Sequence, residues 1–229
     1  MKTVNLKCEL NWSKIETCIL DMDGTLLDLE FDLEVWKKWL PIKFANKNHI
    51  SLDSAKLKIK FLLQFKKGQL DWYRFTYWNQ ILGIDISELE RSISHKIRLR
   101  EGAVDFVLAI RKKCSKLILA TNADPISLNR KNKKFHIFNL FDHVVTSHDL
   151  GYCKEEHLFW FHLQKKTGFK TEDSLIIDDN QSVLDTAKKY GIKYLRGIKN
   201  PSSGGQSLKS DKYILLDNFK LMTDNHELS

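Results

Sequence analysis

The chain has 229 residues, of which 42% are hydrophobic, 11% aromatic and 29% charged, and its net charge is +8. This composition excludes an intrinsically disordered chain and predicts a globular protein with a sizeable core. No apolar run approaches the ~20 residues of a membrane-spanning helix, and the opening residues MKTVNLKCELNW lack the apolar segment of a secretory signal, so we expect a cytoplasmic protein without a membrane partner.

Five short apolar segments predict the strands of a parallel sheet. They are IETCILDM, which starts at residue 15, KLILATN (116–122), HVVTS (143–147), SLIIDDN (174–180) and IKYLRGI (192–198). Their apolar residues fall on both faces, as in strands that helices cover on both sides. Helical stretches alternate with them, including residues 154–168 and 181–191, which end at glycines. The alternation predicts a Rossmann-like, doubly wound α/β sheet.

Residues 30–98 break this alternation and predict four helices without a strand. The expected boundaries are a stop at Pro41, a start after Ser51, a third helix from near Asp71 to Gly83, and a fourth that opens with Asp85 and Glu88 spaced as in a capping box. We expect residues 30–98 to form a helical cap domain over the carboxyl edge of the sheet. Residues 1–29 and 99–229 would then form the α/β core domain, in which NPSSGGQS (200–207) is a loop and YILLDNFKLM supplies a last strand and helix.

The cysteines and the positive charge predict little chemistry. Cys8, Cys18, Cys114 and Cys153 lack the spacing of a zinc site or disulfide framework, so we expect reduced thiols. The densest basic stretch, RKNKKFH (130–136), is short, and we interpret it as a solvated helix face. Because no nucleic-acid-binding motif accompanies the charge, we expect no nucleic-acid partner.

Polar side chains follow several of the predicted strands. Asp21 and Asp23 end the first strand, Thr121 and Asn122 the second, Asp178 and Asp179 the strand SLII, and Lys154 opens the helix after the third strand. The carboxyl ends of parallel strands meet at one edge of a sheet, so we expect these side chains to gather there.

Four carboxylates at one edge require a cation. Two like charges ~4 Å apart repel by about 4 kcal/mol at an effective dielectric constant of about 20. Lys154 offsets one charge, and a divalent ion with oxygen ligands offsets two more; we expect Mg²⁺, which accepts carboxylates and keeps waters for a phosphate oxygen. Asp21 and Asp23, two residues apart in an extended segment, point the same way, so that one can attack phosphorus while the other moves a proton.

Together these segments resemble a known superfamily. DMDGT, the strand ending in ATN, Lys154 and the LIIDD strand end reproduce in order the four motifs of the haloacid dehalogenase (HAD) superfamily of phosphotransferases, across residues 15–198. The resemblance implies that Asp21 is the nucleophile, which forms an aspartyl phosphate, and that Asp23 is the general acid/base. It further implies that Thr121, Asn122 and Lys154 bind phosphate, and that Mg²⁺ is held by Asp21, the backbone carbonyl of Asp23 and Asp179, with Asp178 acting through a water.

A narrower resemblance extends into the predicted cap. The runs DMDGTLLDLEFD, DWYRFTYW, LATNADP, HDLGYCKEE and LIIDDNQSVLDTAKKYGI resemble the bacterial GMP/IMP-specific 5′-nucleotidases of this superfamily. This resemblance implies Mg²⁺-dependent hydrolysis of purine nucleoside 5′-monophosphates, with a small-molecule phosphate monoester as the partner. One departure is Cys153, where the family usually has proline, and we expect a looser turn before Lys154.

Several alternatives stay open. A HAD sugar-phosphate phosphatase or phosphomutase would carry the same four motifs, and a non-catalytic phospholigand-binding module would belong to another class. A calcium loop is disfavoured because an EF-hand requires glycine and glutamate where this chain has Leu26 and Asp32. In the predicted cap, helically spaced aromatic residues either pack in the core or stack on a purine; they are Trp72, Tyr73, Phe75, Tyr77 and Trp78. Trp36 and Trp39 are expected to pack.

Overall fold

A six-stranded parallel sheet organises the computed structural model, which describes residues 10–217 and 219. The strands are β1 (Thr17–Leu20), β2 (Lys116–Thr121), β3 (His143–Thr146), β4 (Ser174–Asp178), β5 (Tyr194–Ile198) and β6 (Leu215–Leu216). Their order is β3-β2-β1-β4-β5-β6, and every neighbouring pair is parallel. The predicted doubly wound α/β sheet is therefore confirmed, including a last strand within YILLDNFKLM. The helix predicted after that strand falls mostly outside the described residues.

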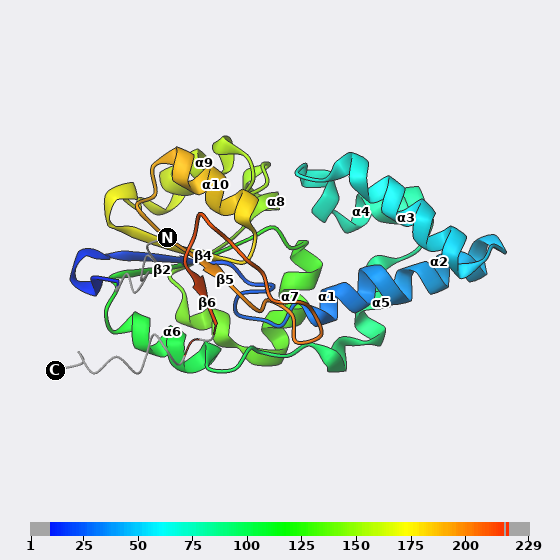
Figure 1. Ribbon diagram of the computed structural model, residues 1–229, viewed down its shortest axis with the longest axis horizontal. Coiled ribbons are helices and arrows are strands. Elements are labelled where there is room, and N and C mark those ends of the chain that lie inside the picture. The colour runs from blue at the N-terminus through cyan, green and yellow to red at the C-terminus, as the bar shows by residue number, and fades with distance from the viewer. Residues whose placement is uncertain (1–9, 218, 220–229) are drawn as a thin grey trace, which may run out of the picture.

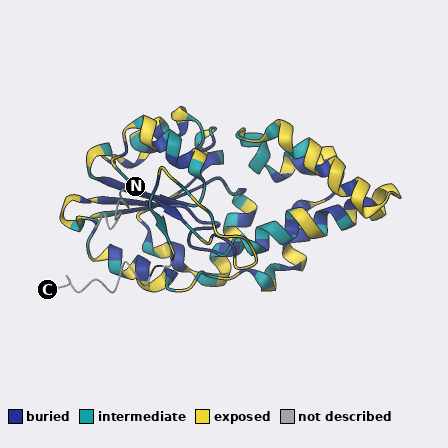
Figure 2. Ribbon diagram, viewed as in Figure 1, coloured by how far each residue is buried: buried dark blue, intermediate teal, exposed yellow. Residues whose placement is uncertain are grey.

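Helices cover both faces of the sheet (Figure 1). Those on one face are α6 (Ala103–Arg111) and α7 (Pro125–Phe135), and those on the other are α8 (Ser147–Leu150), α9 (His157–Thr167) and α10 (Gln181–Tyr190). A hydrophobic cluster lies on each side of the sheet, and alternate residues of β1 contribute to the two clusters. Cys18 and Leu20 pack in one cluster and Ile19 packs in the other. Figure 2 shows the central strands as buried, and β1 and β4 are buried at every residue, as expected for a sheet between two helical layers.

Residues 30–98 form helices that project from the carboxyl edge of the sheet (Figure 1). They are α1 (Glu30–Glu34), a π-helical segment (Val35–Trp39), α2 (Leu40–Asn48), α3 (Leu52–Lys66), a 3₁₀ turn (Leu70–Tyr73), α4 (Phe75–Leu82), α5 (Ile86–Ser92) and a 3₁₀ turn (Ser94–Lys96). The chain leaves and re-enters the sheet region side by side, because Leu27 bridges Leu99 and the Asp28 N–H donates to the Arg98 carbonyl. We propose that these helices constitute a separate cap domain.

The predicted helix stop at Pro41 is wrong. Helical backbone continues from Glu30 to Asn48, and Pro41 lies in the first turn of α2. Directly before it, the Leu40 N–H donates to the carbonyl of Val35, five residues earlier, so this turn is wider than an α-helical one. The first residues of an α-helix donate no backbone N–H within the helix, so proline, which has no N–H, is tolerated there. The π-helical segment places Pro41 at such a position.

The other predicted boundaries agree with the structure, with two refinements. The Ser51 side chain caps α3, and Gly83 ends α4 with a φ of 62°. The side chain of Asp85 accepts the Glu88 N–H, but Glu88 pairs with Arg91, so only half of the capping box forms. The predicted helix near residue 71 begins at Phe75, after a 3₁₀ turn. Within the part of the chain that the structure describes, the helices are all too short or too polar to cross a bilayer.

Candidate active site

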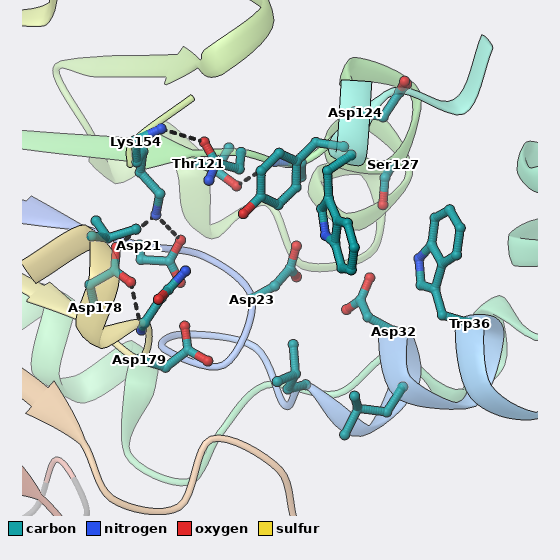
Figure 3. A pocket seen from close by; sticks show the side chains of 18 of the residues that line it. Asp21, Asp23, Asp32, Trp36, Thr121, Asp124, Ser127, Lys154, Asp178 and Asp179 are labelled. Carbon is teal, nitrogen blue, oxygen red and sulfur yellow. Dashed lines mark hydrogen bonds and ion pairs between the residues drawn. The ribbon is translucent and has the colours of Figure 1, made fainter. Parts of the chain in front are cut away.

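A cavity of about 660 Å³ lies where the strand ends face the projecting helices (Figure 3). All seven site residues predicted from the sequence line this cavity: Asp21, Asp23, Thr121, Asn122, Lys154, Asp178 and Asp179. Its opposite wall comes from residues 30–98 and includes Leu33, Trp36, Trp72, Tyr73 and Phe75. The strand ends therefore contribute the predicted polar and charged residues, and the projecting helices contribute the aromatic wall together with charged residues such as Asp32.

Asp21 has one carboxylate oxygen bonded and one without a partner. Its N–H donates to the Ile177 carbonyl at 3.0 Å, which continues the pairing of β1 with β4 by one residue. Its Oδ1 accepts from Lys154, whereas its buried Oδ2 has no hydrogen-bond partner among the described residues. A buried oxygen without a partner is costly, so Oδ2 is the atom at which a substrate or a cation would bind.

Lys154 is the cation at the centre of this carboxylate group. It is 3% exposed, and its Nζ donates to Asp178 Oδ2 at 2.7 Å as well as to Asp21. Burial opposes the charge, but the carboxylates of Asp178 and Asp21 outweigh burial and raise the pKa of Lys154 above its ordinary value. The ammonium therefore stays charged and has its own anionic partners within the protein.

Lys154 precedes its helix and does not open it, contrary to the prediction from the sequence. Helix α9 begins at His157, and the Lys154 N–H donates to Asn122 Oδ1 at 2.9 Å. The Cys153 N–H donates to the Glu156 carboxylate at 2.8 Å, a bond that proline cannot make. This turn is therefore fastened by side chains at the position where the family usually has proline.

Asp21, Asp178 and Asp179 form a group that suits a hard divalent cation. Each offers a carboxylate oxygen, and the three oxygens lie within 4.8 Å of one another. Burial raises the pKa of Asp178 to about 7, with Asp21 adding to the effect and Lys154 opposing it. Burial, Asp21 and Asp178 also raise the pKa of Asp179. A bound cation would relieve this repulsion, and three carboxylate oxygens are ligands that Mg²⁺ accepts.

Gly24 lets the Asp179 carboxylate approach the loop after β1. Its φ is +90°, and a Cβ at this position would lie 2.5 Å from Asp179 Oδ2. Any larger residue would be strained in its backbone and would displace the carboxylate. The glycine of the DMDGT motif is thus explained by a close approach between two parts of the site.

Asp23 lies nearer the projecting helices than Asp21 does (Figure 3) and is paired with a different lysine. Its Oδ1 accepts from Lys131 Nζ at 2.7 Å, and Lys131 also contacts Asp32 of α1. Burial, followed by repulsion from Asp32, raises the pKa of Asp23 to about 7, and Lys131 opposes this shift. The interpretation of residues 130–136 as a solvated face is wrong at Lys131, which is 1% exposed.

Thr121 and Asn122 have different surroundings at the end of β2. The Thr121 Oγ1 accepts the Ala123 N–H at 3.1 Å and lines the cavity. The Asn122 side chain accepts from Lys154 N and donates to Glu155 Oε2 at 2.9 Å. Asn122 therefore ties the end of β2 to the loop that carries Lys154.

Glu155, which none of the sequence motifs singled out, joins three segments. Its carboxylate accepts from Tyr73 Oη at 2.6 Å, from Asn122 Nδ2 and from Asn180 Nδ2 at 3.0 Å. Tyr73 belongs to the projecting helices, and the two asparagines belong to the sheet edge. The only available signal was its place beside Lys154.

Some aromatic residues line the cavity and others pack. Trp72, Tyr73 and Phe75 line it, whereas Trp78 is 1% exposed and packs in the core, with Tyr77 against its edge. Trp36, expected to pack, both lines the cavity and meets Trp78 edge to face at 6.1 Å.

Comparison with known proteins yields consistent matches. The protein-family model for haloacid dehalogenase-like hydrolases matches residues 15–191. The GMP/IMP nucleotidase YrfG of Escherichia coli K12 is 33% identical over 209 residues, covering 91% of this chain and 94% of that protein. A HAD phosphatase from Thermococcus onnurineus shares the fold with a TM-score of 0.76 at 19% identity, covering 91% of this chain and 96% of that one. A HAD family enzyme from Bacteroides thetaiotaomicron, in complex with magnesium and inorganic phosphate, has a TM-score of 0.60 at 17% identity, covering 83% and 97%.

Proposed function

Because this chain belongs to the haloacid dehalogenase-like hydrolases and is a phosphatase of that family, we propose that it hydrolyses purine nucleoside 5′-monophosphates, GMP and IMP foremost, in a Mg²⁺-dependent reaction. The observation that carries the proposal is the unpartnered Oδ2 of Asp21 in a cavity whose other wall is aromatic. The choice of nucleotide is supported by the 33% identical relative, which is a GMP/IMP nucleotidase.

In the first half of the proposed reaction, Asp21 displaces the nucleoside. Its Oδ2 attacks phosphorus, a phosphorus–oxygen bond to Asp21 forms, and the bond to the 5′ oxygen breaks. The electron pair of the broken bond stays on the 5′ oxygen, which takes a proton from Asp23. In the second half, Asp23 takes a proton from water as the water attacks the aspartyl phosphate, so that phosphate leaves and Asp21 is regenerated.

The surrounding residues hold the phosphoryl group during both halves. Lys154 and the Thr121 hydroxyl lie at the end of the sheet where phosphoryl oxygens would bind, and Asn122 keeps the Lys154 loop against β2. Lys154 is fixed by Asp21 and Asp178 before substrate binds, so its charge needs little reorganisation in the transition state.

The metal site would be formed by Asp21, the backbone carbonyl of Asp23 and Asp179, with Asp178 acting through a water. When bound, Mg²⁺ would neutralise negative charge on the transferring phosphoryl group. Asp178 already accepts from Lys154 and from the Asn180 N–H, which leaves Asp179 as the better candidate for direct ligation.

The aromatic wall would hold the purine. Trp36, Trp72, Tyr73 and Phe75 line the cavity on the side of the projecting helices. Flat aromatic rings suit a flat base, because offset stacking adds to the free energy of burial. A sugar phosphate would leave much of this wall uncovered.

Phosphate release from a panel of nucleoside monophosphates and sugar phosphates, with Mg²⁺ and with EDTA, tests the proposal. We expect preferential, Mg²⁺-dependent hydrolysis of GMP and IMP. Release from sugar phosphates alone would retain the chemistry and overturn the nucleotide assignment, in favour of a sugar-phosphate phosphatase or phosphomutase. No release from any substrate by folded, Mg²⁺-loaded protein would favour a phospholigand-binding module.

A further inference from the structure

Lys131 is a buried cation that lies outside the four sequence motifs. It projects from α7 with 1% of its side chain exposed, and its Nζ donates to Asp23 Oδ1 at 2.7 Å. The same ammonium donates to both oxygens of Asp32, at 2.8 and 3.1 Å. Figure 3 shows the carboxylates of Asp23 and Asp32 as neighbours in the cavity. One ammonium therefore joins the loop after β1, α1 and α7.

A purely structural role for Lys131 does not account for its contact with Asp23. A buried ammonium needs an anionic partner, and Asp32, held through both oxygens, already provides one. The bond to Asp23 Oδ1 is additional, and it fixes a carboxylate whose terminal torsion is otherwise broad. Asp23 lines the cavity. Its second oxygen, Oδ2, is not one of the buried oxygens that lack a hydrogen-bond partner among the described residues.

We propose that Lys131 is a positioning residue for proton transfer by Asp23. Lys131 Nζ holds Oδ1, so that Oδ2 faces the ester oxygen, and Asp32 holds the ammonium from the α1 side. This inference rests on the proposed role of Asp23 as the general acid. In the step concerned, Asp23 Oδ2 gives its proton to the departing alkoxide oxygen, while Lys131 keeps all of its protons.

The inference predicts that the effect of removing Lys131 on kcat/KM depends on the leaving group of the substrate. A nucleoside alkoxide needs a proton to leave, whereas p-nitrophenolate is stable as an anion and gains little from an acid. The ratio kcat/KM reports events up to the first phosphoryl transfer, which is the step that expels the leaving group. Removing the ammonium should therefore lower kcat/KM for a nucleotide far more than for p-nitrophenyl phosphate.

The experiment compares kcat/KM for GMP and for p-nitrophenyl phosphate in four proteins: wild type, Asp23→Asn, Lys131→Met and Lys133→Met. We expect Lys131→Met to lower kcat/KM about 100-fold with GMP, as for a misplaced catalytic group, and less than about 5-fold with p-nitrophenyl phosphate. Asp23→Asn should show the same pattern more strongly. Lys133 lies on the same helix and is exposed, so Lys133→Met should behave as wild type with both substrates.

Two further variants test the inference if Lys131→Met does not fold. Lys131→Met combined with Asp32→Asn removes one charge of each sign and so keeps the local charge balanced; we expect it to fold and to retain the leaving-group-dependent loss. Lys131→Arg keeps a cationic donor for Asp23 Oδ1 and should recover most of the loss.

The possible failures can be told apart. Equal losses with both substrates in a folded Lys131 variant would mean a structural role and would overturn the inference. A leaving-group-dependent loss in Asp23→Asn without one in the Lys131 variants would overturn the inference and leave the proposed function intact. No leaving-group dependence in Asp23→Asn would overturn the acid role itself, and absence of turnover in wild type would overturn both proposals.

Discussion

At the scale of single residues, Asp21 is the proposed nucleophile. Its Oδ1 is engaged by Lys154, so only Oδ2 is available to attack. Asparagine has the same shape and can still accept from Lys154 through its amide oxygen, but it cannot form an acyl phosphate in the same way. Chemistry and packing can therefore be separated at this position.

We expect Asp21→Asn to lower kcat by at least about 10⁴-fold while the protein stays folded, because removal of a nucleophile removes the whole covalent route. Phosphate release and near-UV circular dichroism measure the two effects. Asp53→Asn is the matched control, since the Asp53 side chain is 91% exposed, and it should change neither. Turnover by Asp21→Asn within about tenfold of wild type would rule out Asp21 as the nucleophile.

Gly24 gives a second prediction at the residue scale. Gly24→Ala should destabilise the protein by about 1–2 kcal/mol through its left-handed backbone and should also raise the Mg²⁺ concentration needed for activity, because the new Cβ displaces Asp179. Urea unfolding and Mg²⁺ titration of activity measure the two effects.

Gly68→Ala is a matched control for that experiment. Gly68 has a φ of +77°, but an added Cβ would meet no atom within 4 Å. It should lose a similar free energy of unfolding and keep the wild-type Mg²⁺ requirement. Equal Mg²⁺ requirements in the two variants would contradict the contact argument.

At the scale of elements, Asp124 connects the sheet edge to the projecting helices. Its Oδ1 accepts the Ile126 N–H and caps α7, while its Oδ2 accepts the Phe75 N–H at 2.9 Å at the start of α4. This contact explains why α4 begins at Phe75 and not near residue 71. A cap supplied from 49 residues away along the chain cannot be deduced from local sequence.

Asp124→Ala should lower the free energy of unfolding by about 2 kcal/mol, because it removes the caps of two helices at about 1 kcal/mol each. Ser51→Ala removes one cap, that of α3, and should cost about half as much. Urea denaturation measures both variants. Equal costs would mean that the bond to Phe75 contributes nothing to stability.

Asp142 fastens α6 to the start of β2 and gives a pH-dependent prediction. It accepts from Arg111 and from the Leu117 N–H, and the Arg111 hydrogen bond, ahead of the opposing effect of burial, lowers the pKa of Asp142. A lowered pKa in the folded state adds stability above the unfolded pKa of about 3.9, and this stability is lost as the pH falls through the lower folded value.

Asp142→Asn should therefore be less stable than wild type near pH 6, and the difference should shrink as the pH falls below about 4. The difference near pH 6 should be at most about 1 kcal/mol, since the pair is partly exposed to solvent. Urea midpoints of both proteins across this pH range measure it. A difference that grows on acidification would contradict the assignment.

At the scale of the whole molecule, the clustering of three carboxylates opposes folding. Asp21, Asp178 and Asp179 lie close together, and the Lys154 ammonium lies 2.7 Å from Asp178. The mutual repulsion of the carboxylates opposes folding, and we propose that a bound divalent cation relieves it. Binding only to the folded state stabilises it by RT ln(1 + [L]/Kd), about 2.7 kcal/mol at a hundredfold excess over Kd.

We expect Mg²⁺ to raise the Tm of the wild-type protein by several degrees, about 2–4 °C for each kcal/mol in a chain of this size. Without metal, Asp179→Asn should be at least as stable as wild type, because it removes a repelling charge, and it should respond weakly to Mg²⁺. Differential scanning calorimetry with Mg²⁺ and with EDTA measures this. An Asp179→Asn variant that gains as much as wild type would exclude Asp179 as a ligand.

The sequence by itself determined the sheet, the helical interruption at residues 30–98 and the residues at the strand ends. These features are encoded locally: short apolar runs give strands, glycines end helices, and parallel strands bring their carboxyl ends to one edge. The seven residues from Asp21 to Asp179 therefore line one cavity as predicted. Their catalytic and binding roles remain proposals.

Only the tertiary structure decided how those residues are held. Lys131 belongs to a basic stretch that is typical of a solvated face, yet it is buried because Asp23 and Asp32 arrive from 108 and 99 residues away along the chain. Glu155 joins Tyr73 to the sheet edge by the same kind of distant contact. Burial and pairing of charges depend on which segments meet in space, and no local pattern carries that information.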